Sequence, residues 1–346
     1  MERNNFLNLI GKRSLKMKRP TSITIKKLNK KFLEHIKPHI AESTYLGYRS
    51  YANTIDKFIG DEKVADMTTH NLEEFVNVTM LSATMPNGDI GYAKKTRDNY
   101  ASYLKRIFSY IYKQGLLRSN PCAEALEVLG RDEEVVVKPY TNDEIAVIKR
   151  IANDDSDVLA SNMALILLLA ICTGVRPSEL VALTLNDLRK GDTPDTFELV
   201  INKALAITTK SNTKNRSSNR VIVLNSSSVD ALKKILDRND IGFEQAVSSN
   251  SSELPLVRDP MTNQAFVNPK SLYNRSKAAL KNRVCYRGVQ PCRHSFATVC
   301  ADGNISFENI ASMLGHSSTI MVKSRYALYR KTAEGAQVLT QMNNLF

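Results

Sequence analysis

The stretch from 293 to 326 decides how this chain is interpreted. Its informative segments are RHSFAT at 293–298, IASMLGH at 310–316 and SRYA at 324–327. Ser306 can cap the start of a short helix, and Gly315 suits the left-handed position that ends one. His316 therefore stands just past a helix end, between the arginine of the first segment and the tyrosine of the last. A single histidine more often makes a structural hydrogen bond than performs chemistry, so the rest of the chain has to corroborate a site.

Length and charge limit the kind of protein. With 346 residues the chain can form about two domains, each with its own core. Its formal net charge is +13 and its pI is about 9.4, with no acidic tail to offset the basic residues. This balance favours a polyanionic partner, and nucleic acid is the first candidate. An ordinary solubilising surface charge is the alternative.

Neither the cysteines nor the apolar segments indicate an extracellular or membrane protein. The longest apolar run, 163–172, is too short to cross a bilayer, which needs about 20 residues. The basic residues of the N-terminus interrupt any apolar core of a signal peptide. The cysteines are odd in number and match no metal-ligand spacing, so we interpret them as reduced packing residues: Cys122, Cys172, Cys285, Cys292 and Cys300. We expect a cytoplasmic, nucleoid-associated protein without bound metal.

The first part of the chain predicts a basic arm and a helical domain. Residues 1–31 hold ten Lys or Arg against one acid, so residues 1–23 form either an arm on DNA phosphates or a solvated tail. Apolar residues then recur at helical spacing in 43–59, after Met67 and in 94–111. Residues 24–126 are therefore expected to form an all-helical DNA-binding domain. Basic residues at the start of the last helix are expected to contact DNA phosphates: Lys94, Lys95 and Arg97.

A second domain is expected at 140–330, after a linker at 127–139. A capping box formed by Thr141 and Glu144 opens its first helix. Strands are expected at 197–201, 205–208 and 220–224, and helices resume at 229–236 and after Asn268. The segment 239–268 reads as irregular. The expected fold is therefore mainly α, with a small antiparallel β-sheet in the C-terminal domain.

Arg176 lies in the segment TGVRPSEL at 173–180, directly after a buried helix and a glycine turn. Burying this arginine requires an anionic partner, which Glu179 or a ligand phosphate can supply. Five features of the chain together resemble the tyrosine recombinase, or phage integrase, family. They are Arg176 in this setting, a hairpin lysine, Arg293, the LGH of His316 and a tyrosine ten residues later. The resemblance covers nearly the whole chain, with the two domains similar to the family's core-binding and catalytic domains.

The resemblance implies a role for each residue of the motif. Tyr326 would attack a DNA phosphodiester, giving a 3′-phosphotyrosine and a free 5′-hydroxyl. Arg176 and Arg293 would clamp the phosphate, His316 would hydrogen-bond to it, and Glu179 would support the arginines. Lys214 would protonate the leaving oxygen. Lys214 fits the family's spacing to the outgoing strand better than Lys210 does.

Two positions depart from the family pattern. Gln290 stands three residues before the second arginine, where the family has His or sometimes Lys. A glutamine can donate a hydrogen bond to phosphate but cannot accept a proton at neutral pH. The other departure is the spacing of ten residues from His316 to Tyr326, where nine is commoner. Tyr329 is the alternative nucleophile, although its local context fits less well.

The resemblance therefore implies a site-specific recombinase, most simply one that integrates or excises a mobile element. A chromosome-dimer resolvase, a type IB topoisomerase and a DNA-binding protein of this fold with weakened catalysis are the alternatives. Strand exchange through a protein–DNA bond requires neither ATP nor a cofactor. The expected partners are double-stranded recombination sites, three further copies in a tetramer, and an accessory DNA-bending or directionality protein. The tail 331–346 has apolar residues at helical spacing and would dock on a neighbouring copy or pack on its own.

Overall fold

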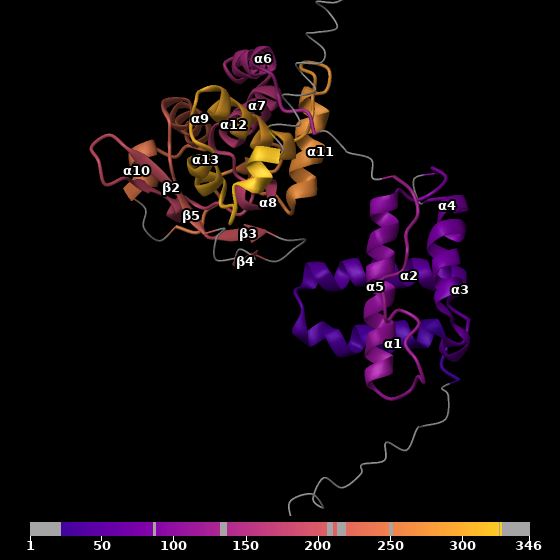
Figure 1. The fold of residues 1–346 in the computed structure, drawn as a ribbon. Coiled ribbons are helices and arrows are strands. Elements are labelled where there is room, and N and C mark those ends of the chain that lie inside the picture. Colours follow the sequence, from indigo (N-terminus) through magenta and orange to yellow (C-terminus); the bar gives the residue numbers. More distant parts are fainter. Residues whose placement is uncertain are drawn as a thin grey trace, which may run out of the picture. The chain divides into compact units, whose positions relative to one another are not determined.

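A computed structural model describes residues 22–85, 88–131, 137–205, 210–212, 219–248, 252–324 and 326. The chain divides into two compact units, residues 1–134 and 135–346, and each is described by itself (Figure 1). Several predicted features lie outside the described residues: most of the basic arm, Lys214, Tyr329 and the tail 331–346.

The first unit is helical throughout its regular structure. Its elements are α1 (Ile25–Ile36), η1 (Lys37–His39), α2 (Glu42–Ile59), η2 (Val64–Asp66), α3 (Thr69–Glu74), the π-helical η3 (Phe75–Thr79), α4 (Met80–Ser82) and α5 (Lys94–Lys113). The expected helices at 43–59 and 94–111 correspond to α2 and α5. Helix α1 was not predicted, because four lysines and other polar residues surround the apolar positions that it buries.

Aromatic side chains from three helices form the core of this unit. The ring of Phe32 on α1 lies 5.9 Å from that of Tyr103 on α5, in an edge-on arrangement. The Tyr103 hydroxyl donates to the buried Asn29 at 3.1 Å, and the Asn29 amide donates to Asp56 of α2 at 2.6 Å. A chain of polar side chains thus connects the three helices inside the aromatic core.

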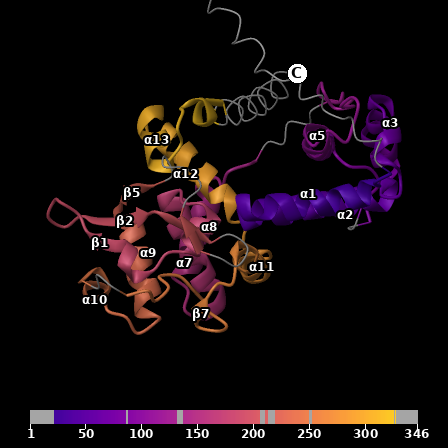
Figure 2. The same ribbon diagram turned by 90° about the horizontal axis from the view of Figure 1, so that it is seen from below.

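The second unit combines helices with short strands. Its helices are α6 (Asn142–Ala152), α7 (Val158–Thr173), α8 (Pro177–Leu180), η4 (Leu185–Asp187), α9 (Ser226–Asp237), α10 (Phe243–Ser248), α11 (Pro269–Leu280), α12 (Gln290–Asp302) and α13 (Phe307–Leu314). Helix α7 is buried on nearly all sides and packs against α6, α9, α11 and α12 (Figure 2). Because apolar side chains cover most of its surface, it forms the central helix of this unit.

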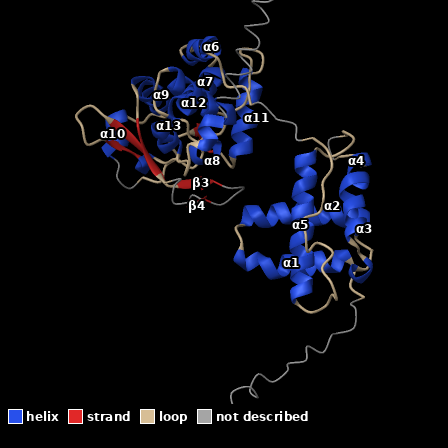
Figure 3. Ribbon diagram, viewed as in Figure 1, coloured by secondary structure: helices blue, strands red, loops and turns tan. Residues whose placement is uncertain are grey.

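The strands are short and antiparallel. They are β1 (Leu188–Lys190), β2 (Phe197–Ile201), β3 (Lys203–Leu205), β4 (Lys210–Asn212), β5 (Arg220–Val223), β6 (Arg258–Asp259) and β7 (Gln264–Ala265). A three-stranded sheet has the order β1-β2-β5, and β3-β4 and β6-β7 form separate pairs. Within the described chain these strands all belong to the second unit (Figure 3), which confirms the expected fold class.

The expected secondary structure was wrong in one place. The segment 239–268 is not irregular throughout, since it contains α10 and the β6–β7 hairpin. These elements are short and lack the long apolar period on which the prediction depends. At the strand expected at 205–208, the structure describes Lys203–Leu205 as β3, and 206–209 lies outside the described residues. No helix in the described parts of the chain is both long and apolar enough to cross a membrane.

Candidate active site

A left-handed turn at the end of α7 begins the site. Gly174 has φ +65° and is the C-terminal cap of α7. A Cβ at this position would lie 2.6 Å from Cδ1 of Phe296 and 2.7 Å from Cδ2 of Leu314. Only glycine therefore allows α12 and α13 to pack this closely on the turn that leads to Arg176.

Glu179 holds Arg176 through two contacts. Its Oε2 accepts from the Arg176 backbone N–H at 2.8 Å, and its Oε1 accepts from Nη1 of Arg176 at 2.7 Å. The Glu179 side chain is only 2% exposed, whereas that of Arg176 is 33% exposed. Glu179 is therefore the buried partner, and the Arg176 side chain keeps a partly exposed surface.

Arg293 is anchored by main-chain oxygens. Its Nη1 donates to the carbonyl of Gly174 at 2.9 Å and its Nη2 to the carbonyl of Leu314 at 2.5 Å. Burial first, and then the charges of Arg176 and Arg220, lower its pKa to about 9, while Glu179 acts in the opposite direction. Arg293 therefore stays protonated at neutral pH, in a site where an additional negative charge is favourable.

The end of α13 places His316 beside Arg293. Gly315 adopts φ 68° at the helix end, and the His316 N–H donates to the carbonyl of Ala311 at 2.9 Å, as the sequence pattern predicts. Nη2 of Arg293 lies 2.8 Å from Nε2 of His316. Because an arginine only donates, Nε2 accepts and the proton resides on Nδ1. Nδ1 is buried and has no hydrogen-bond partner among the residues that the structure describes.

His316 is neutral at physiological pH. Burial and, after it, the charges of Arg293, Arg176, Arg220 and His294 lower its pKa to about 4. An anion in the site would offset these positive charges and raise this pKa again. The cluster therefore has the electrostatics of an anion-binding site.

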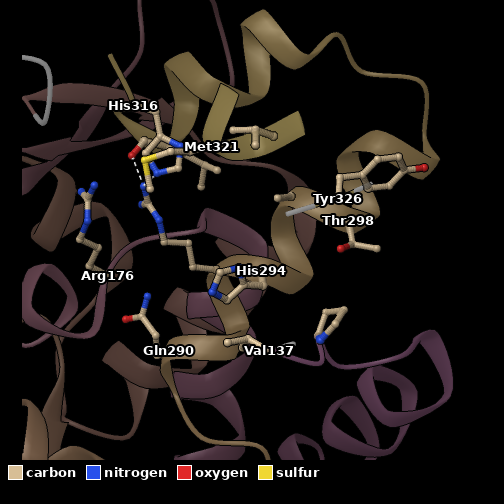
Figure 4. Close-up of a pocket in the computed structure, with 13 residues that line it drawn as sticks. Val137, Arg176, Gln290, His294, Thr298, His316, Met321 and Tyr326 are labelled. Atoms are coloured by element: carbon tan, nitrogen blue, oxygen red, sulfur yellow. Dashed lines mark hydrogen bonds between the residues drawn. The ribbon is translucent and has the colours of Figure 1, made fainter. Parts of the chain in front are cut away.

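One cavity of about 280 Å³ collects most of the predicted residues. Its lining includes Arg176, Gln290, Arg293, His316 and Tyr326 (Figure 4). Arg176 is the N-cap of α8, Gln290 and Arg293 lie on α12, and His316 and Tyr326 lie in the segment after α13. These residues lie up to 150 positions apart in the sequence and meet only through the fold.

Tyr326 lines this cavity with its hydroxyl turned away from the arginine side. The hydroxyl donates to Oδ1 of Asp302 at 3.0 Å, and the ring lies 5.6 Å from that of Phe307. Figure 4 shows Arg176 and His316 on one side and Tyr326 on the other. The structure thus brings Tyr326 to the cavity without aligning its oxygen with the cation cluster.

Two residues near the cluster were missed as functional candidates. Arg220 donates to both carboxylate oxygens of Glu179, and His294 lines the cavity one helical turn after Gln290. His294 was quoted only as the residue that follows Arg293 in the segment 293–298, without a role of its own. Arg220 was read as the start of a strand.

The three residues predicted to bind DNA in the first unit differ in exposure. The prediction was wrong for Arg97, which is 3% exposed. Its guanidinium donates to the carbonyls of Tyr92, Val76 and Leu129, so it ties the start of α5 to its own unit. Lys94 is partly exposed and pairs with Asp98 at 3.4 Å, and Lys95 is exposed.

This set of residues is typical of the tyrosine recombinases. It consists of a buried arginine, a second arginine held by a buried carboxylate, a histidine past a helix end and a tyrosine nearby. The chain belongs to the phage integrase family, whose sequence profile matches residues 140–332. The profile of the phage integrase N-terminal SAM-like domain matches residues 24–80.

Individual relatives are distant but cover most of the chain. IntQ of Escherichia coli (strain K12), whose name marks it as a defective protein, is 25% identical over 342 residues, which is 91% of this chain and 82% of IntQ. The tyrosine recombinase XerD of Rickettsia prowazekii (strain Madrid E) is 24% identical over 294 residues, or 80% of this chain and 84% of XerD.

Solved structures share the fold. The Tn1549 transposon integrase, in complex with a circular intermediate DNA, superposes with a TM-score of 0.69 at 19% identity, covering 91% of this chain and all of that chain (100%). Lambda integrase, as a tetramer bound to a Holliday junction, gives a TM-score of 0.57 at 18% identity, covering 88% of this chain and 78% of that one.

Proposed function

We propose that this protein is a site-specific DNA recombinase that cuts and rejoins strands through a 3′-phosphotyrosine intermediate. The observation that carries this proposal is the cluster of Arg176, Arg293 and His316 on the cavity that Tyr326 also lines. Family membership and the net charge of +13 support DNA as the substrate.

In this mechanism the arginines bind the non-bridging oxygens of the scissile phosphate. Arg176 reaches them from its exposed side, and Arg293 from the N–H groups that its carbonyl partners and His316 leave available. The Tyr326 oxygen attacks phosphorus, the new P–O bond joins protein to DNA, and the bond to the 5′-oxygen breaks. The leaving 5′-oxygen takes a proton from Lys214, which lies outside the described residues. Religation reverses these steps with a different 5′-hydroxyl.

The Tyr326 oxygen is not yet aligned for attack on the phosphate. Because the Tyr326 hydroxyl donates to Asp302, cleavage requires that hydrogen bond to break and the tyrosine to turn toward the phosphate. The phenol proton must then leave the site. Gln290 cannot accept it, so water or another side chain has to serve.

We further propose integration or excision of a mobile element as the biological role. The fold shared with the Tn1549 transposon integrase supports this role, and the relative XerD keeps chromosome-dimer resolution as the second candidate. Residues 24–126 would bind the duplex and 140–330 would perform the chemistry. Four copies would assemble on paired sites, with the tail 331–346 docking between neighbours, and an accessory bending or directionality protein would set the direction.

A nicked suicide substrate tests the chemistry. The substrate carries the protein's own site, found by selecting bound fragments from the DNA that flanks its gene, and denaturing electrophoresis detects the covalent adduct. We expect an adduct with the unchanged protein and none with Tyr326→Phe. An adduct of undiminished yield in Tyr326→Phe would overturn the assignment of the nucleophile. Recombinant products, rather than only relaxed plasmid, would distinguish a recombinase from a topoisomerase.

A DNA-binding protein with weakened catalysis is the alternative to an active recombinase, and Gln290 is the residue that favours it. In that case the protein would retain site-specific binding on the same substrate yet give no adduct. A Gln290→His variant that gained the adduct would then identify the defective step.

A further inference from the structure

Arg220 connects three elements of the site with one guanidinium. It is the first residue of β5, and its side chain is 5% exposed. Its Nη1 and Nη2 donate to Oε1 and Oε2 of Glu179 at 3.2 and 2.8 Å, and its Nε donates to the carbonyl of Met313 at 2.7 Å. The strand, the start of α8 and the end of α13 are therefore joined at a single side chain.

At one end of this connection, Arg220 keeps Glu179 ionised and immobile. Burial alone would raise the pKa of this carboxyl, but the hydrogen bonds and charge of Arg220, followed by those of Arg176, hold it below its usual value. Because both oxygens of Glu179 are fixed by Arg220, the carboxylate meets Arg176 in one orientation. Without Arg220, the buried carboxylate would be free to turn and take both nitrogens of Arg176 for itself.

At the other end, Arg220 shares the C-terminus of α13 with Arg293. Arg220 binds the carbonyl of Met313, and Arg293 binds the next carbonyl, that of Leu314. Carbonyls in the last turn of a helix lack intrahelical partners and carry the negative end of the helix dipole. Two arginines from different elements thus fix the helix end from which His316 projects.

We propose that Arg220 is a positioning residue that holds Arg176, through Glu179, and His316, through the end of α13, on the same scissile phosphate. This inference rests on the proposed function and deepens it, because it names a residue that touches neither DNA nor the reacting atoms. It predicts that loss of Arg220 impairs the chemical step rather than DNA binding.

The test compares Arg220→Met with Arg238→Met. Arg238 is a matched control because it is also a largely buried arginine of this unit, with hydrogen bonds to Asn162, Asp155 and Ser161, but it lies at the end of α9. Thermal unfolding establishes that both variants are folded at the assay temperature. We expect Arg220→Met to slow single-turnover adduct formation by roughly 100-fold, the effect of a displacement of about 1 Å at a reacting centre. DNA affinity should change by less than threefold, and Arg238→Met should react at the unchanged rate.

Further variants separate geometry from charge. Arg220→Lys keeps the charge but cannot bind both Glu179 oxygens and the Met313 carbonyl at once, so its rate should lie between those of Arg220→Met and the unchanged protein. If Arg220 acts partly through Glu179, the double variant Arg220→Met/Glu179→Gln should be much less impaired than the product of the two single effects. Independent, multiplicative losses, or an Arg220→Met rate within threefold of that of Arg238→Met, would overturn the inference.

A readout without catalysis keeps this inference distinguishable from the proposed function. If the unchanged protein forms no adduct, the proposed function fails. The environment of His316 can still be measured from the NMR chemical shifts of its imidazole C–H groups. Arg220→Met should move these shifts, and Arg238→Met should leave them in place. Unmoved shifts in Arg220→Met would show that α13 does not depend on Arg220.

Discussion

The Tyr326 hydroxyl donates a hydrogen bond to Oδ1 of Asp302 at 3.0 Å, on the side of the cavity away from Arg176. Since this bond must break before cleavage, Asp302→Ala should accelerate adduct formation. A net hydrogen bond contributes about 1 kcal/mol, which corresponds to roughly a fivefold rate increase. Single-turnover assays on the nicked substrate measure it, with Glu308→Ala as a control for removing a nearby acid. A slower reaction in Asp302→Ala would assign that carboxylate a supporting role instead.

Replacing Arg293 should destabilise the protein more than replacing Arg176, although both replacements should abolish the chemistry. Arg293→Ala leaves the carbonyls of Gly174 and Leu314 without their donor in a buried site, so we expect a loss of about 2–4 kcal/mol in the free energy of unfolding. Arg176→Ala should lose under about 1 kcal/mol, because Arg176 is partly exposed and Glu179 keeps Arg220. Both variants should fail to form the adduct. Urea unfolding measures the difference, and equal losses would contradict this interpretation.

His316 should make stability depend on pH. Its pKa in the folded protein is about 4, below the value of about 6.5 in an unfolded chain. Between these values the unfolded chain binds the proton more strongly, so the contribution of His316 to stability is present above pH 6.5 and is lost as the pH falls toward 4. Between pH 7 and pH 5 the unchanged protein should therefore lose more unfolding free energy than His316→Asn. Equal losses in the two proteins would show that His316 does not titrate in this way.

Gln290 offers a test by gain of function. It is exposed and lines the cavity, so Gln290→His would introduce a side chain that can accept a proton there. We expect faster adduct formation above a pH of about 6.5, where a histidine of ordinary pKa is neutral. Gln290→Ala is the matched control and should be slower, because it loses a donor to the phosphate. A Gln290→His rate equal to that of Gln290→Ala at every pH would mean that this position contributes neither a proton acceptor nor a donor.

Arg97 and Lys95 should have opposite phenotypes. Arg97→Met removes the donor to three carbonyls, of which that of Val76 is buried and the other two partly buried, and the first unit should lose about 2–4 kcal/mol of stability. Lys95→Met should unfold as the unchanged protein does, yet bind DNA more weakly, with a salt slope lower by about 1. Calorimetry and binding titrations at several salt concentrations measure the two effects. An unchanged affinity in Lys95→Met would remove Lys95 from the DNA interface.

Local signals in the sequence predicted the structure well where one residue determines one contact. The capping box of Thr141 and Glu144 opens α6, Ser306 caps α13, and Gly315 ends it with His316 just beyond. The resemblance identified Arg176, Arg293 and His316, which the fold brings together. The helix caps depend only on residues that are close together in the sequence. The site residues were found from a motif whose members occur in this chain in the family's order.

Contacts between distant segments could not be predicted in this way. Arg220 and Glu179 are 41 residues apart, and nothing in either local pattern indicates that they pair. Arg97 was assigned to the surface because charged side chains usually lie there, and only the carbonyls around it explain its burial. The orientation of Tyr326 depends on Asp302, which is 24 residues away in the sequence.

Carbonyl oxygens hold two arginines of the site: those of Gly174 and Leu314 bind Arg293, and that of Met313 binds Arg220 beside its bonds to Glu179. Every amino acid supplies a carbonyl, so a change of side chain at Met313 leaves this support in place as long as α13 still ends at the same residue. Selection can therefore alter the residues around the catalytic cluster, and with them the surface offered to DNA, without dismantling the cluster itself. Reliance on the main chain gives the protein freedom to evolve toward new target sites.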